Sequence, residues 1–209
     1  GIGKENIYVY FSGNEGFHVY VFNSQFQKIG SKERSELVDY IMFRGAIPET
    51  FGMKKFKPNR SLFPDFNQKG WNGRFSKQVF GSKSKRSKII SELLDNGYPS
   101  FQKILDDVSE NIGVKIDPNV TMDIHRIFRL PGSINSKSGL TKILCTDITK
   151  FDPYTDACFL NDDSVEVLAN CPIEFKLKNK KFGPYINEKI SLPTYAAVYL
   201  ICKKLAIIA

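Results

Sequence analysis

The sequence contains no apolar run close to the roughly 20 residues that a membrane-spanning helix requires. Its first residues, GIGKENIYVYF, also lack the basic-then-apolar order of a secretory signal peptide. We therefore expect a globular protein of the cytoplasm that has no membrane partner. With 209 residues, 42% of them hydrophobic, the chain is long enough to bury a core in one or two domains.

Cysteine and histidine are both scarce. Four cysteines stand far apart, with no Cys-x-x-Cys pair among them: Cys145, Cys158, Cys171 and Cys202. This spacing excludes a zinc knuckle and a dithiol redox motif, so we expect reduced and buried thiols. The only two histidines, His18 and His125, leave few metal ligands or general bases and so disfavour a phosphodiesterase.

Positive charge is concentrated in one segment. The chain has a net charge of +8, and residues 54–88 alone carry eleven lysines and arginines against one acidic residue, Asp65. Six aromatic residues are interleaved with these cations, and this combination is typical of a surface where phosphates meet charge and bases stack on rings. The alternative is a solvated basic face whose aromatic residues lie in the core.

We predict that this basic segment contacts a single-stranded DNA template or a primer duplex. The candidate residues are Lys54, Lys55, Lys57, Arg60, Arg74, Lys77, Lys85 and Arg86.

The order of predicted elements favours an α+β fold over a doubly wound sheet. Strand-like runs occur at residues 7–11, 17–22, 114–117, 142–145, 164–168 and 173–177. Helical patterns occur at residues 31–45, 84–96, 100–111, 121–128 and 192–208. Residues 46–83, rich in proline, glycine and asparagine, are expected to be irregular or to form short strands.

The first two predicted strands enclose a polar turn, in the stretch YFSGNEGFHVYVF (residues 10–22). Ser12 offers a hydroxyl and Gly13 an unobstructed backbone N–H, and such groups bind phosphate oxygens at a strand end. His18 follows on the next strand and could donate to a phosphate. Taken alone, however, this segment favours a tight hairpin with a hydrogen-bonded core histidine.

A second polar segment covers residues 115–140. Asp117 ends an apolar run and precedes a proline, so its carboxylate is expected at a strand edge, a usual place for a Mg²⁺ ligand. Arg126 and Arg129 are expected on one helix face, as further candidates for binding nucleic acid. Ile124, Ile127 and Phe128 are then expected on the opposite face, toward the core.

The loop SINSKSG (residues 133–139) presents Ser136 and Lys137, which are candidate phosphate ligands. The acidic residues and the polar loop of this second segment also have purely structural explanations. Asp123 suits a helix dipole better than a metal site, and SKSG could be an ordinary solvent-exposed loop.

In this order and separation, the two segments resemble the second and third motifs of the archaeo-eukaryotic primase superfamily, in particular the small catalytic subunit of DNA primase. The resemblance implies that the incoming triphosphate is held by the residues at four positions: Ser12, Gly13, Gly16 and His18. It also implies that Asp117 is the catalytic residue that binds Mg²⁺ or Mn²⁺, and that Lys137 binds phosphate. The implied fold is a catalytic core whose mixed β-sheet is flanked by helices.

The implied activity is nucleotidyl transfer, in which NTPs or dNTPs are joined into a short primer on a single-stranded DNA template. The implied partner is the primase large subunit, and the implied location is the cytoplasm or, in an archaeon, the nucleoid. Two alternatives remain open. One is a non-catalytic module that binds nucleic acid or nucleotides, and the other is a primase-polymerase of a plasmid, virus or repair system.

The sequence departs from the family pattern in three places. Family members often have arginine where this chain has Asn14-Glu15, and histidine where it has Asn135. The family's first motif, a strand-borne Asp-x-Asp pair upstream of the hairpin, is absent. Because phosphoryl transfer uses two divalent ions and one carboxylate cannot hold both, we expect an N-terminal fragment to supply the missing pair. Residues 1–209 would then form the C-terminal two-thirds of the core, with 46–100 as a basic insertion.

Overall fold

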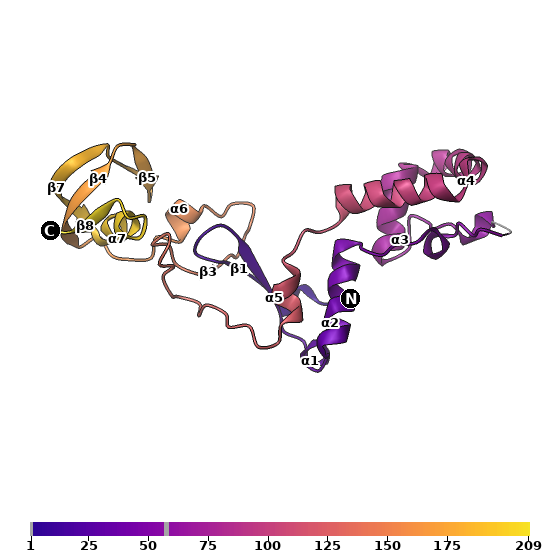
Figure 1. Cartoon of the computed structure of the whole chain (residues 1–209), viewed down its shortest axis with the longest axis horizontal. Helices are drawn as coiled ribbons and strands as arrows, with labels where there is room; N and C mark the ends of the chain where they lie inside the picture. The colour runs from indigo at the N-terminus through magenta and orange to yellow at the C-terminus, as the bar shows by residue number, and fades with distance from the viewer. Residues whose placement is uncertain (1, 57–58) are drawn as a thin grey trace. The chain divides into compact units, whose positions relative to one another are not determined.

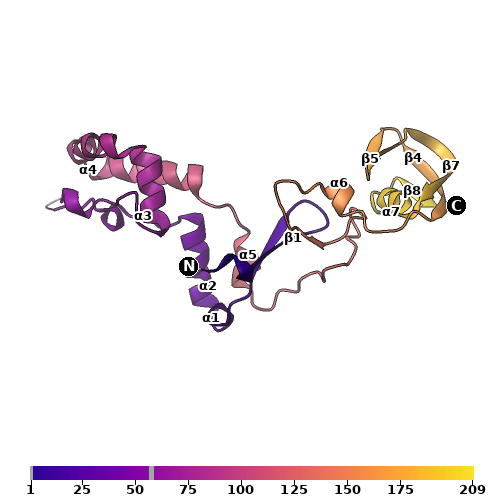
Figure 2. The same ribbon diagram turned by 180° about the vertical axis from the view of Figure 1, so that it is seen from behind.

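The structure is a computed structural model of the chain, and it describes residues 2–56 and 59–209. It divides into two compact units. The first unit combines the chain up to Lys28 with Ile127–Ala209, and the second consists of Ile29–Arg126. We describe each unit by itself (Figures 1 and 2).

The first unit begins with a β-hairpin. Strands β1 (Ile7–Phe11) and β2 (Phe17–Val21) pair antiparallel, with Tyr10 opposite His18, and β3 (Ile143–Leu144) joins the other edge of β1. β-Branched and aromatic side chains fill both hairpin strands, as expected for residues that pack well on a pleated surface. The predicted hairpin is therefore confirmed, and it starts after a short 3₁₀ helix, η1 (Lys4–Asn6).

The rest of the first unit is built around a second antiparallel sheet. Its strands are ordered β7 (Tyr185–Pro193), β4 (Ser164–Cys171) and β8 (Ala206–Ile208). Alternate residues of β4 are buried, and helix α7 (Thr194–Cys202) packs on these strands (Figure 1). The core of this unit includes Phe11, Leu140, Val167, Tyr195 and Leu200.

Smaller elements complete the first unit. They are α1 (Ser24–Gln27), α6 (Pro153–Asp156) and the two-stranded ribbon of β5 (Phe175–Leu177) and β6 (Lys180–Phe182). Strands β6, β7 and β8 were not predicted. The expected helix over 192–208 ends at Cys202, because Lys204 adopts a left-handed conformation and the chain returns to the sheet as β8.

The second unit is helical. It contains α2 (Ser31–Met42), α3 (Gly70–Phe75), the π-helix η4 (Ser76–Phe80), α4 (Lys83–Ile112) and α5 (Pro118–Met122). Two 3₁₀ helices precede α3: η2 (Pro48–Phe51) and η3 (Arg60–Leu62). Helix α4 bends at Gly97, whose φ of 78° is not helical, so it corresponds to the two helices predicted from the sequence. Apart from η2 and η3, the described residues between 46 and 69 are irregular, as predicted, whereas residues 70–80 form the helices α3 and η4, which were not predicted.

The aromatic residues of the basic segment form the core of the second unit. Phe63, Trp71, Phe75 and Phe80 are all buried there, whereas Phe56 is 87% exposed. The expectation of aromatic rings available for base stacking is therefore wrong for most of them. The alternative, a basic face over an aromatic core, describes this segment better.

The predictions for residues 114–128 are also wrong. Residues 114–117 form no strand, and residues 121–128 form no helix beyond the end of α5 at Met122. Asp117 caps α5 and Pro118 occupies its first position, so the helix begins before the predicted cap at Thr121. Ile124, Ile127 and Phe128 are exposed rather than part of the core.

Helices and antiparallel sheets together confirm the α+β class. Every strand pairing among the described residues is antiparallel, so the expected mixed sheet is instead a set of small antiparallel sheets. In the described part of the chain, no helix combines the length and the apolarity that crossing a membrane requires.

Candidate functional site

The turn between β1 and β2 is closed around Ser12. The Ser12 N–H donates to the Gly16 carbonyl at 2.7 Å, and the Ser12 hydroxyl oxygen accepts from the N–H groups of Asn14 (3.3 Å) and Gly16 (3.2 Å). These bonds gather backbone amides around one side-chain oxygen at the mouth of the hairpin. The Ser12 hydroxyl can still donate its own hydrogen.

The polar loop 133–139 lies directly against this turn. The Ser138 hydroxyl donates to the Gly13 carbonyl, and a Cβ atom added at Gly13 would lie 3.1 Å from the Cβ of Asn135. The structure thus places the hairpin turn against the loop of the second motif, although Gly13 and Ser138 are 125 residues apart in the sequence. Ser136 and Lys137 are exposed on the same loop.

Gly13 is required at this junction for two reasons. Its φ of +85° lies in the left-handed region, and an added Cβ would be 3.0 Å from the Leu140 carbonyl oxygen. Asn135 is buried inside the loop, and its side-chain oxygen accepts a hydrogen bond from the Lys137 N–H at 2.9 Å. The loop is therefore held by its own side chains rather than being an ordinary solvent-exposed connection.

His18 lies on β2 with its ring packed beside two aromatic rings. The ring centroids of Tyr20 and Phe128 are 6.5 and 6.2 Å from that of His18. The histidine is half-buried on the hairpin face that also carries Tyr10 and Tyr20. Its phosphate-binding role stays a prediction.

Arg129 contacts the hairpin turn directly. Its Nη1 donates to the Ser12 carbonyl oxygen at 3.0 Å, so the guanidinium lies beside the phosphate-binding candidates. The predicted helix face shared by Arg126 and Arg129 does not exist, because no helix covers these residues and the two arginines belong to different units. Their nucleic-acid contact stays a prediction.

Lys142 was missed by the sequence analysis. It is fully buried, and its ammonium donates to the Tyr20 hydroxyl at 2.5 Å and to the Arg129 carbonyl at 2.8 Å. In the sequence it stands in the short run TKIL, where nothing distinguishes it from a surface lysine of a strand. Only the fold shows that this lysine lies behind the hairpin.

Asp117 belongs to the second unit, where it caps helix α5. Its Oδ1 accepts from the Asn119 N–H at 3.0 Å, and its Oδ2 lies 3.6 Å from Arg126 Nη2. The carboxylate is exposed at the N-terminus of a helix rather than at a strand edge. Asp123 lies at the C-terminal end of α5, where its Oδ1 accepts from the His125 N–H, so the suggested role at the positive end of a helix dipole is wrong.

Most of the predicted nucleic-acid ligands are exposed cations of the second unit. Lys54, Lys55, Arg60, Arg74, Lys77 and Lys85 all lie at the surface. Arg86 differs, because its guanidinium donates to the carbonyls of Phe63 (2.7 Å) and Pro64 (3.2 Å), and is half-buried. Lys57 lies outside the described residues.

Comparison with known proteins identifies the family. The family model of the DNA primase small subunit matches residues 1–146, which include the hairpin, Asp117 and the loop around Lys137. The chain belongs to this primase family.

Relatives of this primase chain are archaeal. The "DNA primase small subunit PriS" of Nitrosopumilus maritimus (strain SCM1) is 80% identical over 208 residues, which are 100% of this chain and 56% of the relative. That of Cenarchaeum symbiosum (strain A) is 48% identical over 99% of this chain and 55% of its own length. The "DNA primase small subunit PriS" of Archaeoglobus fulgidus is 29% identical over 96% of this chain and 59% of its own length. This chain thus spans little more than half the length of these relatives.

The cysteines of the primase chain are largely buried, as expected. Cys145, Cys158 and Cys171 are buried and unpaired, and Cys202 is partly exposed. Burial raises the pKa of the Cys158 thiol to about 11, which keeps it protonated and unreactive at neutral pH. Among the described residues, no three His, Cys, Asp or Glu side chains come close enough together to hold a metal ion.

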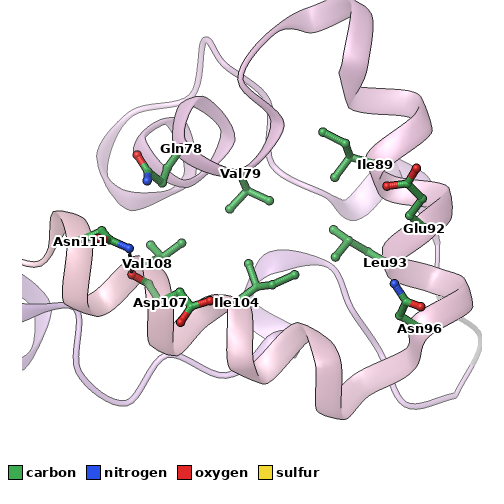
Figure 3. A pocket seen from close by; sticks show the side chains of 10 residues that line it. All are labelled: Gln78, Val79, Ile89, Glu92, Leu93, Asn96, Ile104, Asp107, Val108 and Asn111. Carbon is green, nitrogen blue, oxygen red and sulfur yellow. Dashed lines mark hydrogen bonds between the residues drawn. The ribbon is translucent and has the colours of Figure 1, made fainter.

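A pocket of about 370 Å³ opens in the second unit of the primase chain, between the two arms of α4 and the π-helix η4 (Figure 3). Its apolar lining includes Val79, Leu93 and Ile104, and two carboxylates, those of Glu92 and Asp107, lie on its wall. These negative charges oppose a phosphate-bearing ligand. The hairpin turn and its loop therefore remain the candidate for a nucleotide site.

Proposed function

We propose that this chain is the part of a DNA primase small subunit that holds the incoming nucleoside triphosphate, in an enzyme that copies single-stranded DNA into a short primer. The observation that carries the proposal is the meeting of the hairpin turn with the loop 133–139 at Gly13, inside the segment that the family model matches. NTPs, and dNTPs as alternative substrates, share the triphosphate that such a site would bind.

In this proposal, each group of the first unit has a distinct task. The Ser12 hydroxyl and the amides of the turn donate hydrogen bonds to phosphate oxygens, and His18 donates from the adjacent strand. Lys137 contributes a mobile positive charge, and Ser136 a hydroxyl, from the exposed loop. Together these donors orient the triphosphate and balance its charge.

Asp117 is proposed as a ligand of Mg²⁺ or Mn²⁺. Its exposed carboxylate is a hard oxygen donor of the kind these ions prefer, so its chemistry fits, but one carboxylate makes an incomplete site. Bound divalent ions would lower the pKa of the primer hydroxyl and neutralise the triphosphate. The role of Arg126, 3.6 Å from Asp117, would be to hold the carboxylate oriented until an ion binds.

We further propose that an N-terminal segment carrying the Asp-x-Asp pair completes the metal site. One face of the hairpin supports a missing neighbour, because Ile7, Val19 and Val21 on that face are 37%, 63% and 37% exposed. Strand β2 is also the edge of its three-stranded sheet. An exposed apolar face beside an unpaired strand edge is normally covered in a complete protein.

The exposed cations of residues 54–85 are proposed to hold the backbone of the template or of the primer duplex. Their charge is suited to phosphates, and because the aromatic residues of this segment are buried, contact through charge is favoured over base stacking. A large subunit is the expected protein partner, and the nucleoid the expected location in an archaeal cell.

A chimera tests this proposal. In it, the present chain replaces the 208 matching residues of the Nitrosopumilus maritimus relative, so that the remaining part of the relative supplies any further carboxylates. We expect primer synthesis on single-stranded DNA with Mg²⁺ or Mn²⁺. Asp117→Asn should reduce primer synthesis at least about a hundredfold. Replacing a residue that only hydrogen-bonds to a metal ligand already lowers metal affinity or activity about ten- to a hundredfold, and Asp117 is proposed as a ligand itself.

The matched control is Asp123→Asn. Asp117 and Asp123 are both exposed and both accept a backbone N–H two residues ahead, so asparagine preserves the same local bond in each. The control should therefore keep full activity. Equal activity of the two variants would overturn the assignment of Asp117 as a metal ligand. It would favour the alternative in which this chain is a non-catalytic binding module.

A further inference from the structure

Lys142 is a fully buried cation behind the hairpin. Its side chain is 0% exposed, and its Nζ lies 4.7 Å from the ring centroid of Tyr20 and 5.5 Å from that of Tyr10. Two hydrogen bonds complete its surroundings, one to the Tyr20 hydroxyl and one to the Arg129 carbonyl. The ammonium is therefore enclosed by two aromatic rings and two oxygen acceptors.

Among the ion pairs of the described residues, none includes Lys142. Among the residues that the structure describes, the hydrogen-bonding partners of the Lys142 ammonium are a neutral hydroxyl and a neutral carbonyl. A buried charge without an opposite charge costs free energy, even where aromatic faces and hydrogen bonds offset part of the cost. A neutral apolar side chain of similar length would fill the same space at a lower cost, so stability alone does not account for this lysine.

Lys142 is connected to the hairpin turn through one residue, Arg129. The ammonium holds the carbonyl of Arg129, and the guanidinium of Arg129 holds the carbonyl of Ser12. Arg129 lies in a stretch without helix or strand hydrogen bonds, and its side chain is exposed. Its direction toward the turn therefore depends on the few contacts that fix its backbone.

We propose that Lys142 is a positioning residue of the triphosphate site. Its ammonium fixes the Arg129 peptide so that the guanidinium stays on the Ser12 carbonyl and the turn keeps the shape in which its amides converge. The inference rests on the proposed function for the nucleotide, while the positioning of Arg129 and of the turn is a property of the chain without ligand.

The substitution Lys142→Met tests the inference, because methionine fills the space without the charge or the donor. We expect Mg²⁺–ATP to bind the chain about tenfold more weakly, the order of loss for one charged hydrogen bond. We also expect faster amide hydrogen exchange at Asn14 and Gly16, whose N–H groups close the turn onto Ser12.

Lys178→Met is the matched control in the same unit. The Lys178 ammonium likewise donates to a carbonyl, that of Leu160 at 3.0 Å, and lies 4.4 Å from the ring centroid of Tyr195. In the part of the chain that the structure describes, the hydrogen bond and the ring contact of Lys178 involve neither Arg129 nor the turn. We expect this variant to lose stability while its affinity for Mg²⁺–ATP and its exchange at Asn14 and Gly16 stay as in the unsubstituted chain.

The outcomes separate the possibilities. Exchange at Asn14 and Gly16 that is equally fast in Lys142→Met and Lys178→Met would overturn the positioning role. If Lys142→Met does not fold, Tyr20→Phe removes one hydrogen bond of the ammonium and keeps the ring, and it should give a smaller change of the same kind. An unsubstituted chain that binds no Mg²⁺–ATP would refute the proposed function, while the exchange data would still decide the role of Lys142.

Discussion

At the scale of single residues, the proposed site depends on Gly13. Gly13 combines a left-handed backbone with an approach of 3.0 Å between its missing Cβ and the Leu140 carbonyl, so the turn and the loop meet only because no side chain stands there. Gly132, in the same unit, has a similar φ of +83° but nothing within 4 Å of its missing Cβ. Comparing substitutions at Gly13 and Gly132 therefore distinguishes the cost of a left-handed backbone from the cost of a steric clash.

We predict that Gly132→Ala lowers the free energy of unfolding by about 1 kcal/mol, the cost of a left-handed alanine. Gly13→Ala should lose about 1 to 3 kcal/mol more, because the added methyl group must displace backbone of the loop. Chemical denaturation of the two variants measures the difference. Equal losses would mean that the loop does not pack on the turn as described.

At the scale of elements, a single side-chain pair ties the bend of α4 to η2. The Tyr98 hydroxyl donates to Glu49 Oε2 at 2.6 Å, which lowers the pKa of Glu49 and raises the pKa of Tyr98. Because the pKa of Glu49 is lower in the folded state, the pair stabilises the fold when Glu49 is ionised. This stabilisation is lost as the pH falls through the folded-state pKa.

We predict a pH-dependent effect of Tyr98→Phe. The variant should be less stable than the unsubstituted chain at neutral pH, and the difference should begin to shrink as the pH falls toward 4.5, the ordinary pKa of glutamate. Urea denaturation between pH 7 and pH 3 measures it, with Glu49→Gln as the companion variant. A stability difference that stays constant between pH 7 and pH 3 would contradict the account that ionised Glu49 accepts the stabilising hydrogen bond from Tyr98.

The exposed lysines of η4 and α4 give a second prediction at this scale. Lys77 and Lys85 lie on the surface of the second unit, and replacing both with alanine should flatten the dependence of log Kd on log salt by about 1.4 for single-stranded DNA. The loss of affinity should be similar for all DNA sequences. Lys176→Ala in the exposed part of β5 is the control, and an unchanged slope in the double variant would remove these lysines from the DNA surface.

Elements whose local pattern and fold agreed were predictable from the sequence. Two apolar runs on either side of a polar turn identified the β1–β2 hairpin, and Gly97 with Pro99 identified the break in α4. The pattern of residues 114–128 predicted the wrong elements, because Asp117 and Pro118 start a helix where an apolar run indicated a strand. The apolar residues that follow α5 are exposed, so their helical spacing reflects no buried face.

The structure bears on the supports of the candidate site more than on its proposed ligands. The phosphate-binding roles of Ser12, Gly13 and Lys137 come from the family resemblance and stay predictions. The roles of Ser138, Arg129 and Lys142 depend on contacts between segments more than a hundred residues apart, or on burial, and no local pattern encodes these. Asn135, a departure from the family pattern, proved to be a buried support of the loop.

At the scale of the whole molecule, the chain forms two compact units and spans little more than half the length of its PriS relatives. The first unit carries the turn and the loop, and the second carries Asp117 and the exposed cations. The exposed apolar face of the hairpin is the observation on which the proposal of a further segment depends. What the first unit contributes by itself is the proposed cradle for a triphosphate.

NMR spectroscopy of the 209-residue chain with Mn²⁺ and a non-hydrolysable nucleoside triphosphate tests this cradle most directly. Paramagnetic Mn²⁺ carried by the bound triphosphate should broaden the amide signals of Gly13, Gly16 and Lys137 first, and Lys137→Met should weaken the effect. Unchanged signals at these three residues, with broadening instead at the pocket beside Asn96 and Asn111, would contradict the account.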